Sequence, residues 1–177
     1  LPTDPAAPSG VANLAAFAAP APAPAPAPEP VEPAEPPHSP FALHSFGPGP
    51  QVGAAKEIVV SIGQQSVWAY ENGEVVQASL ASTGTGVVPE AETPLGTFQI
   101  LTKYDVQDME GNIGGYYRVE DVPDVMYFDN AGNALHGTYW HEAFGTRQSR
   151  GCVNLPLDVA AWLYDWAPIG TPVTVLP

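Results

Sequence analysis

Residues 135 to 155 read LHGTYWHEAFGTRQSRGCVNL, and this stretch decides how the rest of the chain is interpreted. It contains the only cysteine of the 177 residues, Cys152, and two of the four histidines, His136 and His141. A lone buried cysteine is usually an inert small hydrophobe. This one lies in a polar segment beside a glycine and two arginines, a setting that favours a thiolate. A cysteine nucleophile needs a base within hydrogen-bond reach, and either histidine can supply it.

Three motifs, in this order along the chain, resemble the L,D-transpeptidases with the YkuD-type catalytic domain. Residues 93–98 read TPLGTF, residues 136–138 read HGT, and residues 149–155 read SRGCVNL. The resemblance covers about residues 56 to 177. At one position the chain departs from the family pattern: the residue before the Gly-Cys pair is most often His, and here it is Arg150.

The resemblance implies a role for each residue of the candidate pair. Cys152 is the nucleophile, His136 is the base, and a backbone carbonyl, here that of Gly137, orients the imidazole. It also implies peptidoglycan stem peptides as substrates, joined into cell-wall cross-links through a thioester acyl-enzyme, without metal or cofactor. An L,D-carboxypeptidase of the same fold and a catalytically silent wall-binding module are the alternatives. A purely structural β-domain would not explain Cys152 and its neighbours.

The residues themselves leave some roles open. His141 is the rival base. The backbone N–H groups of Gly151 and Cys152 are candidate donors to an oxyanion. Zinc binding by the histidines, Glu142 and the cysteine matches neither the HExxH nor the CxxC spacing. The predicted catalytic set is Cys152, His136, Gly137, Ser149 and Gly151. The predicted substrate-binding set is Arg150, Asn154, Tyr116, Tyr117, Thr138 and His141.

A lowered thiol pKa is predicted from two features of the sequence. A helix is expected from Pro156 to Trp166, and its N-terminal end favours an anion nearby. Arg147 and Arg150 add positive charge just upstream of Cys152. We therefore expect that Arg150→Ala raises the thiol pKa and weakens acylation.

The charge balance excludes some partners. The formal net charge is −14, with 19 acidic and 5 basic residues. Nucleic acids and anionic membranes both require clustered Lys and Arg, so neither is an expected partner. No apolar run is long enough to span a membrane, and no signal peptide is visible, so we expect a processed or truncated chain. The expected protein is monomeric and extracytoplasmic, in the cell envelope or secreted.

Composition divides the chain into two parts. Residues 1–52 form a predicted disordered linker, because the first 50 residues hold 15 of the 22 prolines and alternate strictly with Ala from Pro20 to Pro28. Residues 53–177 form the predicted catalytic domain. Many short predicted strands and one helix after the cysteine indicate a mainly β fold, and the family resemblance implies a β-sandwich-like domain. Asn72-Gly73 predicts a hairpin. Residues 105–123 are expected to form a long loop, and the resemblance implies that this region is a flap over the active site. Residues 171–176 are expected to form a closing strand.

Overall fold

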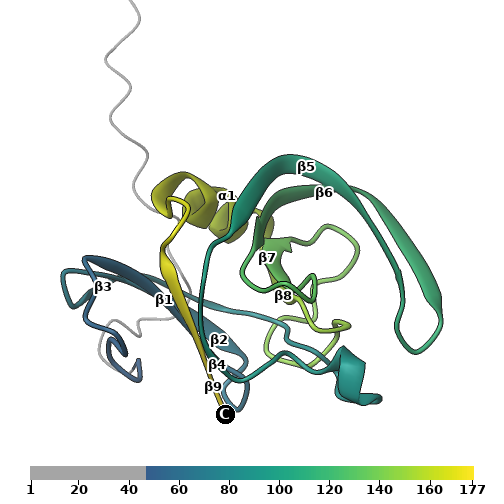
Figure 1. Cartoon of the computed structure of the whole chain (residues 1–177), viewed down its shortest axis with the longest axis horizontal. Helices are drawn as coiled ribbons and strands as arrows, with labels where there is room; N and C mark the ends of the chain where they lie inside the picture. Colours follow the sequence, from purple (N-terminus) through teal and green to yellow (C-terminus); the bar gives the residue numbers. More distant parts are fainter. Residues whose placement is uncertain (1–46) are drawn as a thin grey trace, which may run out of the picture. The chain divides into compact units, whose positions relative to one another are not determined.

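The computed structural model describes residues 47–177, and the segment predicted to be disordered lies almost wholly outside this range. The described residues form two β-sheets, one short 3₁₀ helix and one α-helix (Figure 1). The predicted mainly β fold is therefore confirmed. In chain order the elements are β1 (Lys56–Ser61), β2 (Ser66–Glu71), β3 (Glu74–Leu80), η1 (Pro89–Ala91), β4 (Gly96–Gln99), β5 (Thr102–Asn112), β6 (Tyr116–Tyr127), β7 (Ala134–Gly137), β8 (Val153–Leu155), α1 (Leu157–Trp166) and β9 (Pro172–Leu176).

The first sheet has the strand order β3-β2-β1-β9-β4. Its neighbouring strands are antiparallel except β1 and β9, which run parallel. The predicted hairpin between β2 and β3 is confirmed, because Asn72 and Gly73 both have positive φ, 51° and 88°. Such a turn has a backbone twist that matches the twist of the strands on either side. The predicted closing strand is β9, which lies between β1 and β4.

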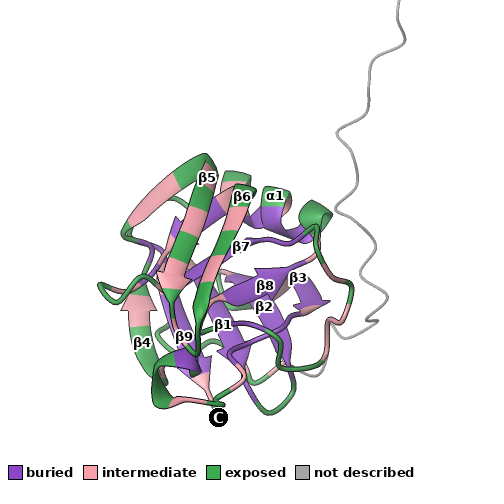
Figure 2. Ribbon diagram, turned by 90° about the vertical axis from the view of Figure 1, so that its right-hand side faces the viewer, coloured by how far each residue is buried: buried purple, intermediate pink, exposed green. Residues whose placement is uncertain are grey.

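The second sheet has the strand order β5-β6-β7-β8, and only β7 and β8 are parallel. The prediction of a long loop over residues 105–123 is wrong, because β5 and β6 pair through this region as a long curved hairpin (Figure 1). Side chains of β5 are all exposed or half-buried, and those of β6 become buried only in its second half (Figure 2). The hairpin therefore lacks the apolar alternation by which a strand is recognised in a sequence.

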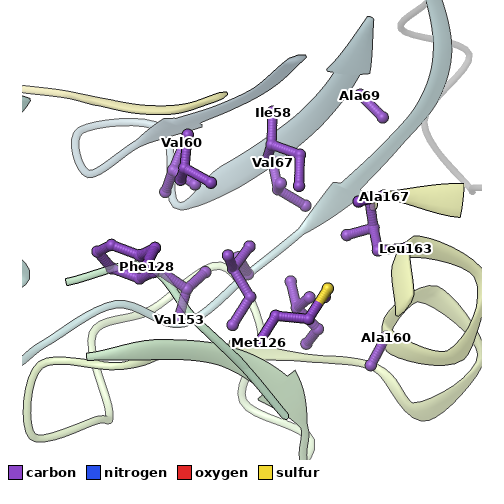
Figure 3. Packing of buried hydrophobic residues seen from close by; sticks show 14 of the residues in the cluster. Ile58, Val60, Val67, Ala69, Met126, Phe128, Val153, Ala160, Leu163 and Ala167 are labelled. Atoms are coloured by element: carbon purple, nitrogen blue, oxygen red, sulfur yellow. The ribbon is translucent and has the colours of Figure 1, made fainter. Parts of the chain in front are cut away.

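The main hydrophobic core lies between the two sheets and is closed at one side by α1. Figure 3 shows side chains of β1 and β2 facing those of β6 and α1. Every residue of β7 and β8 is buried. Leu135, Val153 and Leu155 have no exposed surface, and burying an aliphatic side chain of this size contributes about 1.5–3 kcal/mol. The two strands that carry the HGT and Cys motifs are thus fixed by the core.

The helix α1 begins one residue later than predicted, because Pro156 is its N-cap. Its buried residues are Val159, Ala160 and Leu163, and it packs on β6 and β7. Trp162 and Trp166 stack on each other with ring centroids 5.4 Å apart. Among residues 47–177 there is no helix whose length and apolar character would let it cross a membrane.

The segment before β1 contacts the first sheet through a buried carboxylate. Glu57 is 1% exposed, and its side chain accepts hydrogen bonds from the backbone N–H groups of Gln51, Val52 and Gly53 at 2.6, 2.9 and 3.1 Å. Three donors to one carboxylate hold these residues against the domain. Where the linker ends, predicted at residue 52, stays a prediction.

A truncation series tests this contact. A chain that starts at Ala54 loses all three donors, whereas one that starts at Gly47 keeps them. Since hydrogen bonds to a charged group contribute about 1.5–3 kcal/mol, we expect the shorter chain to have a thermal midpoint several degrees lower. Differential scanning calorimetry of the two chains checks this, and equal midpoints would show that the contact does not stabilise the fold.

Candidate active site

The two strands β7 and β8 bring the predicted pair together. In their parallel register His136 lies opposite Asn154, and Cys152 precedes Asn154 by two residues. Side chains two residues apart along an extended chain point to the same face. His136, Cys152 and Asn154 accordingly line one cavity of about 60 Å³. The other residues of this first cavity are Met109, Tyr117, Val119, Val122, Trp140, Gln148, Ser149 and Arg150.

His136 is buried in a form that suits a base. Its Nδ1 is 3.0 Å from the Gly137 carbonyl oxygen, which accepts only a hydrogen bond, so Nδ1 carries the proton. The other ring nitrogen, Nε2, then has the free lone pair. Burial lowers the pKa of His136 to about 4, despite the opposing effect of the Gly137 hydrogen bond. The imidazole is therefore neutral near pH 7, and the carbonyl contact predicted from the sequence is present.

The depressed histidine pKa predicts a loss of stability in acid. The unfolded chain binds this proton near pH 6.5, but the folded chain does so only near pH 4. The contribution is therefore complete above pH 6.5 and is lost as pH falls through about 4. It amounts to about 3 kcal/mol. We expect urea unfolding between pH 7 and 4 to show this loss in the wild type and not in His136→Gln, beyond the acid dependence that both share. The prediction would be contradicted if the free energy of unfolding fell equally steeply with decreasing pH in the two proteins.

Ser149 holds the cysteine loop. Its hydroxyl accepts a hydrogen bond from the Gly151 N–H at 3.2 Å and donates one to the Cys152 carbonyl at 2.5 Å. The Gly151 N–H is therefore already engaged, which argues against the oxyanion role predicted for it. Thr93, from the TPLGTF motif, accepts a hydrogen bond from the Gly84 N–H and donates one to the Gly151 carbonyl at 2.8 Å. The first and last of the three motifs thus meet at Gly151.

The prediction of a lowered thiol pKa is wrong for the resting protein. Burial raises the pKa of Cys152 to about 11, the Asp129 charge adds to this, and a hydrogen bond from the Ala134 backbone opposes it. The helix does not begin beside the cysteine, because β8 lies between Cys152 and α1. At neutral pH the site therefore holds a neutral thiol and a neutral imidazole.

The two arginines near the cysteine point to other partners. The Arg150 guanidinium lies over the Tyr117 ring, 4.7 Å from its centroid. Arg147 lies 3.8 Å from a carboxylate oxygen of Glu92. Neither arginine is among the groups that set the Cys152 pKa. Stabilisation of the thiolate by Arg150, which the sequence predicted, is therefore not supported.

A second, larger cavity of about 810 Å³ is also lined by Cys152. Both cavities are lined by Cys152, Arg150, Tyr117 and Met109, so the Arg150–Tyr117 pair stands where they meet. The second cavity lies between the β5–β6 hairpin, η1 and the turn before β7. Its acidic lining residues are Glu90, Glu92, Asp108, Glu110 and Asp129.

His141 has both ring nitrogens engaged. Its Nδ1 accepts a hydrogen bond from the Ala143 N–H at 3.2 Å, and its Nε2 lies 2.9 Å from the Asn154 side-chain amide. A neutral imidazole has one donor and one acceptor nitrogen. Nε2 therefore carries the proton. The Asn154 atom 2.9 Å from it is the amide nitrogen, so this amide is assigned the opposite orientation, which places its oxygen there as the acceptor. His141 lies outside both cavities and holds Asn154 in place.

The structure separates the predicted substrate-binding residues into two groups. Arg150, Asn154 and Tyr117 line the first cavity. Tyr116 is 70% exposed and donates to Glu110, and Thr138 is buried beneath the site; neither lines either cavity. Trp140, whose ring centroid is 5.6 Å from that of His136, was not predicted as a site residue. Its position two residues after the HGT motif was the available signal. The other missed residues are Met109, Val119, Val122 and Gln148.

We also looked in the described part of the chain for side chains that could bind a metal ion together. Within residues 47–177, no three His, Cys, Asp or Glu side chains are grouped so that they could hold a metal ion.

Comparison with known proteins agrees with this geometry. A family model described as the L,D-transpeptidase catalytic domain (YkuD) matches residues 55–175. The chain belongs to this family. It is 26% identical over 156 residues to L,D-transpeptidase 1 of Mycobacterium tuberculosis strain H37Rv, a match that covers 80% of this chain and 59% of that relative.

Solved structures of L,D-transpeptidases share the fold. One from Mycobacterium smegmatis is 30% identical, with a TM-score of 0.63 over 71% of this chain and 60% of its own. L,D-transpeptidase 3 from Mycobacterium tuberculosis, solved with a faropenem-derived adduct, is 27% identical, with a TM-score of 0.62 over 70% and 60%. The chain thus spans about three-fifths of the length of these relatives.

Proposed function

We propose that this chain is a cysteine-dependent L,D-transpeptidase that cross-links peptidoglycan stem peptides outside the cytoplasm, at the cell wall. The observation that carries the proposal is that His136 on β7 and Cys152, directly before β8, line one shared cavity. The Gly137 contact leaves Nε2 of His136 available to accept the thiol proton. The proposal also draws on a relative, L,D-transpeptidase 3 from Mycobacterium tuberculosis, which was solved in complex with a faropenem-derived adduct.

The proposed first step forms a thioester. Cys152 Sγ attacks the carbonyl carbon of the donor peptide while its proton passes to His136 Nε2. The C–N bond to the terminal D-alanine then breaks, and the imidazolium returns the proton to the departing amine. Both groups are neutral at rest, so the proton moves as the S–C bond forms rather than before it. Since Gly151 N–H is engaged with Ser149, the Cys152 N–H is the remaining predicted donor to the oxyanion.

The proposed second step releases the enzyme. The amine of a neighbouring stem peptide attacks the thioester carbon and loses its proton to His136. The N–C bond forms, the C–S bond breaks, and the proton returns to Sγ. If water attacks instead, the same chemistry makes the chain an L,D-carboxypeptidase.

Product analysis tests the proposal. The full chain is incubated with a donor tetrapeptide that ends in D-alanine and with a second stem peptide as acceptor, and the products are identified by mass spectrometry. A transpeptidase releases D-alanine and forms the cross-linked dimer. Released D-alanine without dimer would show a carboxypeptidase, and no release would show a silent wall-binding module. Gel filtration tests the expected monomer.

Arg150 is proposed to bind a carboxylate of the donor peptide. A guanidinium can hold a carboxylate through two parallel hydrogen bonds, and Arg150 stands where the two cavities meet Cys152. We expect Arg150→Ala to raise the donor KM about tenfold, since a charge-assisted hydrogen bond contributes about 1.5–3 kcal/mol. The thiol pKa, measured by iodoacetamide alkylation against pH, should stay unchanged.

The matched control is Arg118→Ala. Arg118 pairs with Asp108 and Glu120 on the hairpin and lies outside both cavities. Its loss should leave the donor KM near the wild-type value. If Arg150→Ala behaves like this control, Arg150 does not bind the donor.

A further inference from the structure

The turn between β6 and β7 lies directly against the nucleophile. The Gly132 carbonyl oxygen is 3.9 Å from Cys152 Sγ. The backbone of Ala134, the first residue of β7, also acts on the thiol and lowers its pKa against the larger effect of burial. The sulfur thus faces an acceptor for its proton in this short segment.

One carboxylate keeps this turn in shape. Asp129 Oδ1 accepts hydrogen bonds from the N–H groups of Ala131 and Asn133 at 3.0 and 2.8 Å. Its Oδ2 accepts a third from the Asn133 side-chain amide at 2.6 Å. The buried Phe128 anchors the turn, because its N–H donates to the Asn133 carbonyl at 3.0 Å. Aspartate commonly organises turns through such bonds to the following backbone.

Asn133 connects this turn to the cysteine loop by a close contact. Its Oδ1 approaches Gly151 so closely that a Cβ at that position would lie 2.3 Å away. Gly151 has a φ of +118°, which side chains rarely adopt, and its carbonyl accepts the Thr93 hydroxyl. Residue 151 is therefore held between Asn133 and Thr93, and Cys152 follows it directly.

We infer that Asp129 and Asn133 are positioning residues for the nucleophile. The Asp129 carboxylate fixes the turn, the turn holds the Gly132 carbonyl against the sulfur, and the Asn133 amide fixes the cysteine loop. The inference rests on the proposed function only in taking Cys152 as the nucleophile.

The Asp129 charge has a second effect on the same sulfur. A nearby anion disfavours a thiolate, so Asp129 helps to keep the resting cysteine protonated. The other titratable or charged groups that face the sulfur, or line the cavities around it, are His136 from β7, Tyr117 and Tyr127 from β6, Arg150 from the cysteine loop, Asp108 and Glu110 from β5, and Glu90 and Glu92 at η1.

Two substitutions in the full chain separate geometry from charge. Asn133→Ala removes the contact to Gly151, and we expect acylation by the donor peptide to slow about 10–100-fold, because small misplacements of a reacting group cost up to ~10²-fold. Asp129→Asn keeps an oxygen for the turn but removes the charge. We expect its iodoacetamide alkylation midpoint to lie at a lower pH than the wild-type midpoint, because the nearby anion that disfavours the thiolate is gone.

The control is Asn130→Ala, an exposed residue of the same turn. The inference is wrong if two results coincide with this control. These are an acylation rate of Asn133→Ala equal to that of Asn130→Ala, and an alkylation midpoint of Asp129→Asn equal to that of Asn130→Ala. A lower thermal midpoint in either variant, with both of those readouts unchanged, would contradict it equally. A wild-type chain that no donor peptide acylates would instead refute the proposed function, and the alkylation midpoint would still test Asp129.

Discussion

Cys152→Ala is expected to fold like the wild type and to release no D-alanine from a donor peptide. The contacts that shape the loop do not use the side chain of Cys152: its carbonyl accepts the Ser149 hydroxyl, and the N–H of the preceding Gly151 donates to the same hydroxyl. Removing the sulfur leaves these bonds in place. It also leaves no other thiol in the chain, because Cys152 is its only cysteine. This variant should therefore lose all activity and keep the thermal midpoint of the wild type.

Mass spectrometry of the products and a thermal melt check both halves of this prediction. The informative control is Ser149→Ala, which keeps the sulfur but removes both hydroxyl bonds, and we expect it to retain part of the activity. Turnover by Cys152→Ala at a measurable fraction of the wild-type rate would rule out the assigned nucleophile.

His136→Ala is expected to slow acylation by about 10²–10⁴-fold, the usual contribution of a general base. His136 is neutral at pH 7, presents a free Nε2 and lines the same cavity as Cys152. Burial raises the pKa of the thiol to about 11, so only a very small fraction is thiolate at neutral pH. We therefore expect acylation to depend on proton transfer to the histidine as the S–C bond forms.

His141→Ala is the matched comparison. This histidine uses both ring nitrogens to hold the Ala143 N–H and the Asn154 amide, so neither nitrogen is free to take the thiol proton. We expect a loss of less than about tenfold, within the range of a positioning contact. Single-turnover acylation rates of the two variants show which histidine is the base. A larger loss of rate in His141→Ala than in His136→Ala would reverse the assigned roles.

The features predicted correctly from the sequence are those that a few neighbouring residues determine. Asn72-Gly73 demanded positive φ at two successive residues, which few other residue pairs accept. The apolar residues of α1 recur at helical spacing, and the catalytic pair lies in motifs that resemble one family. Each of these signals lies within a few residues of the feature that it predicts.

The features that the sequence missed depend on contacts between distant segments. β5 and β6 have half-polar faces, so nothing in residues 105–123 marked them as strands until their pairing was known. The shift of the thiol pKa was predicted in the wrong direction, because the charges of sequence neighbours do not tell how far a side chain is buried. Arg150 is adjacent to the Gly-Cys pair in sequence, yet its guanidinium lies on Tyr117 of the hairpin.

The central claim is that Cys152 forms a covalent acyl-enzyme. The most direct measurement is the intact mass of the full chain after incubation with a carbapenem, followed by peptide mapping. The account predicts one adduct per chain, located on Cys152, strongly slowed in His136→Ala and absent in Cys152→Ala. An unmodified wild-type mass, or an adduct of equal yield in Cys152→Ala, would contradict it.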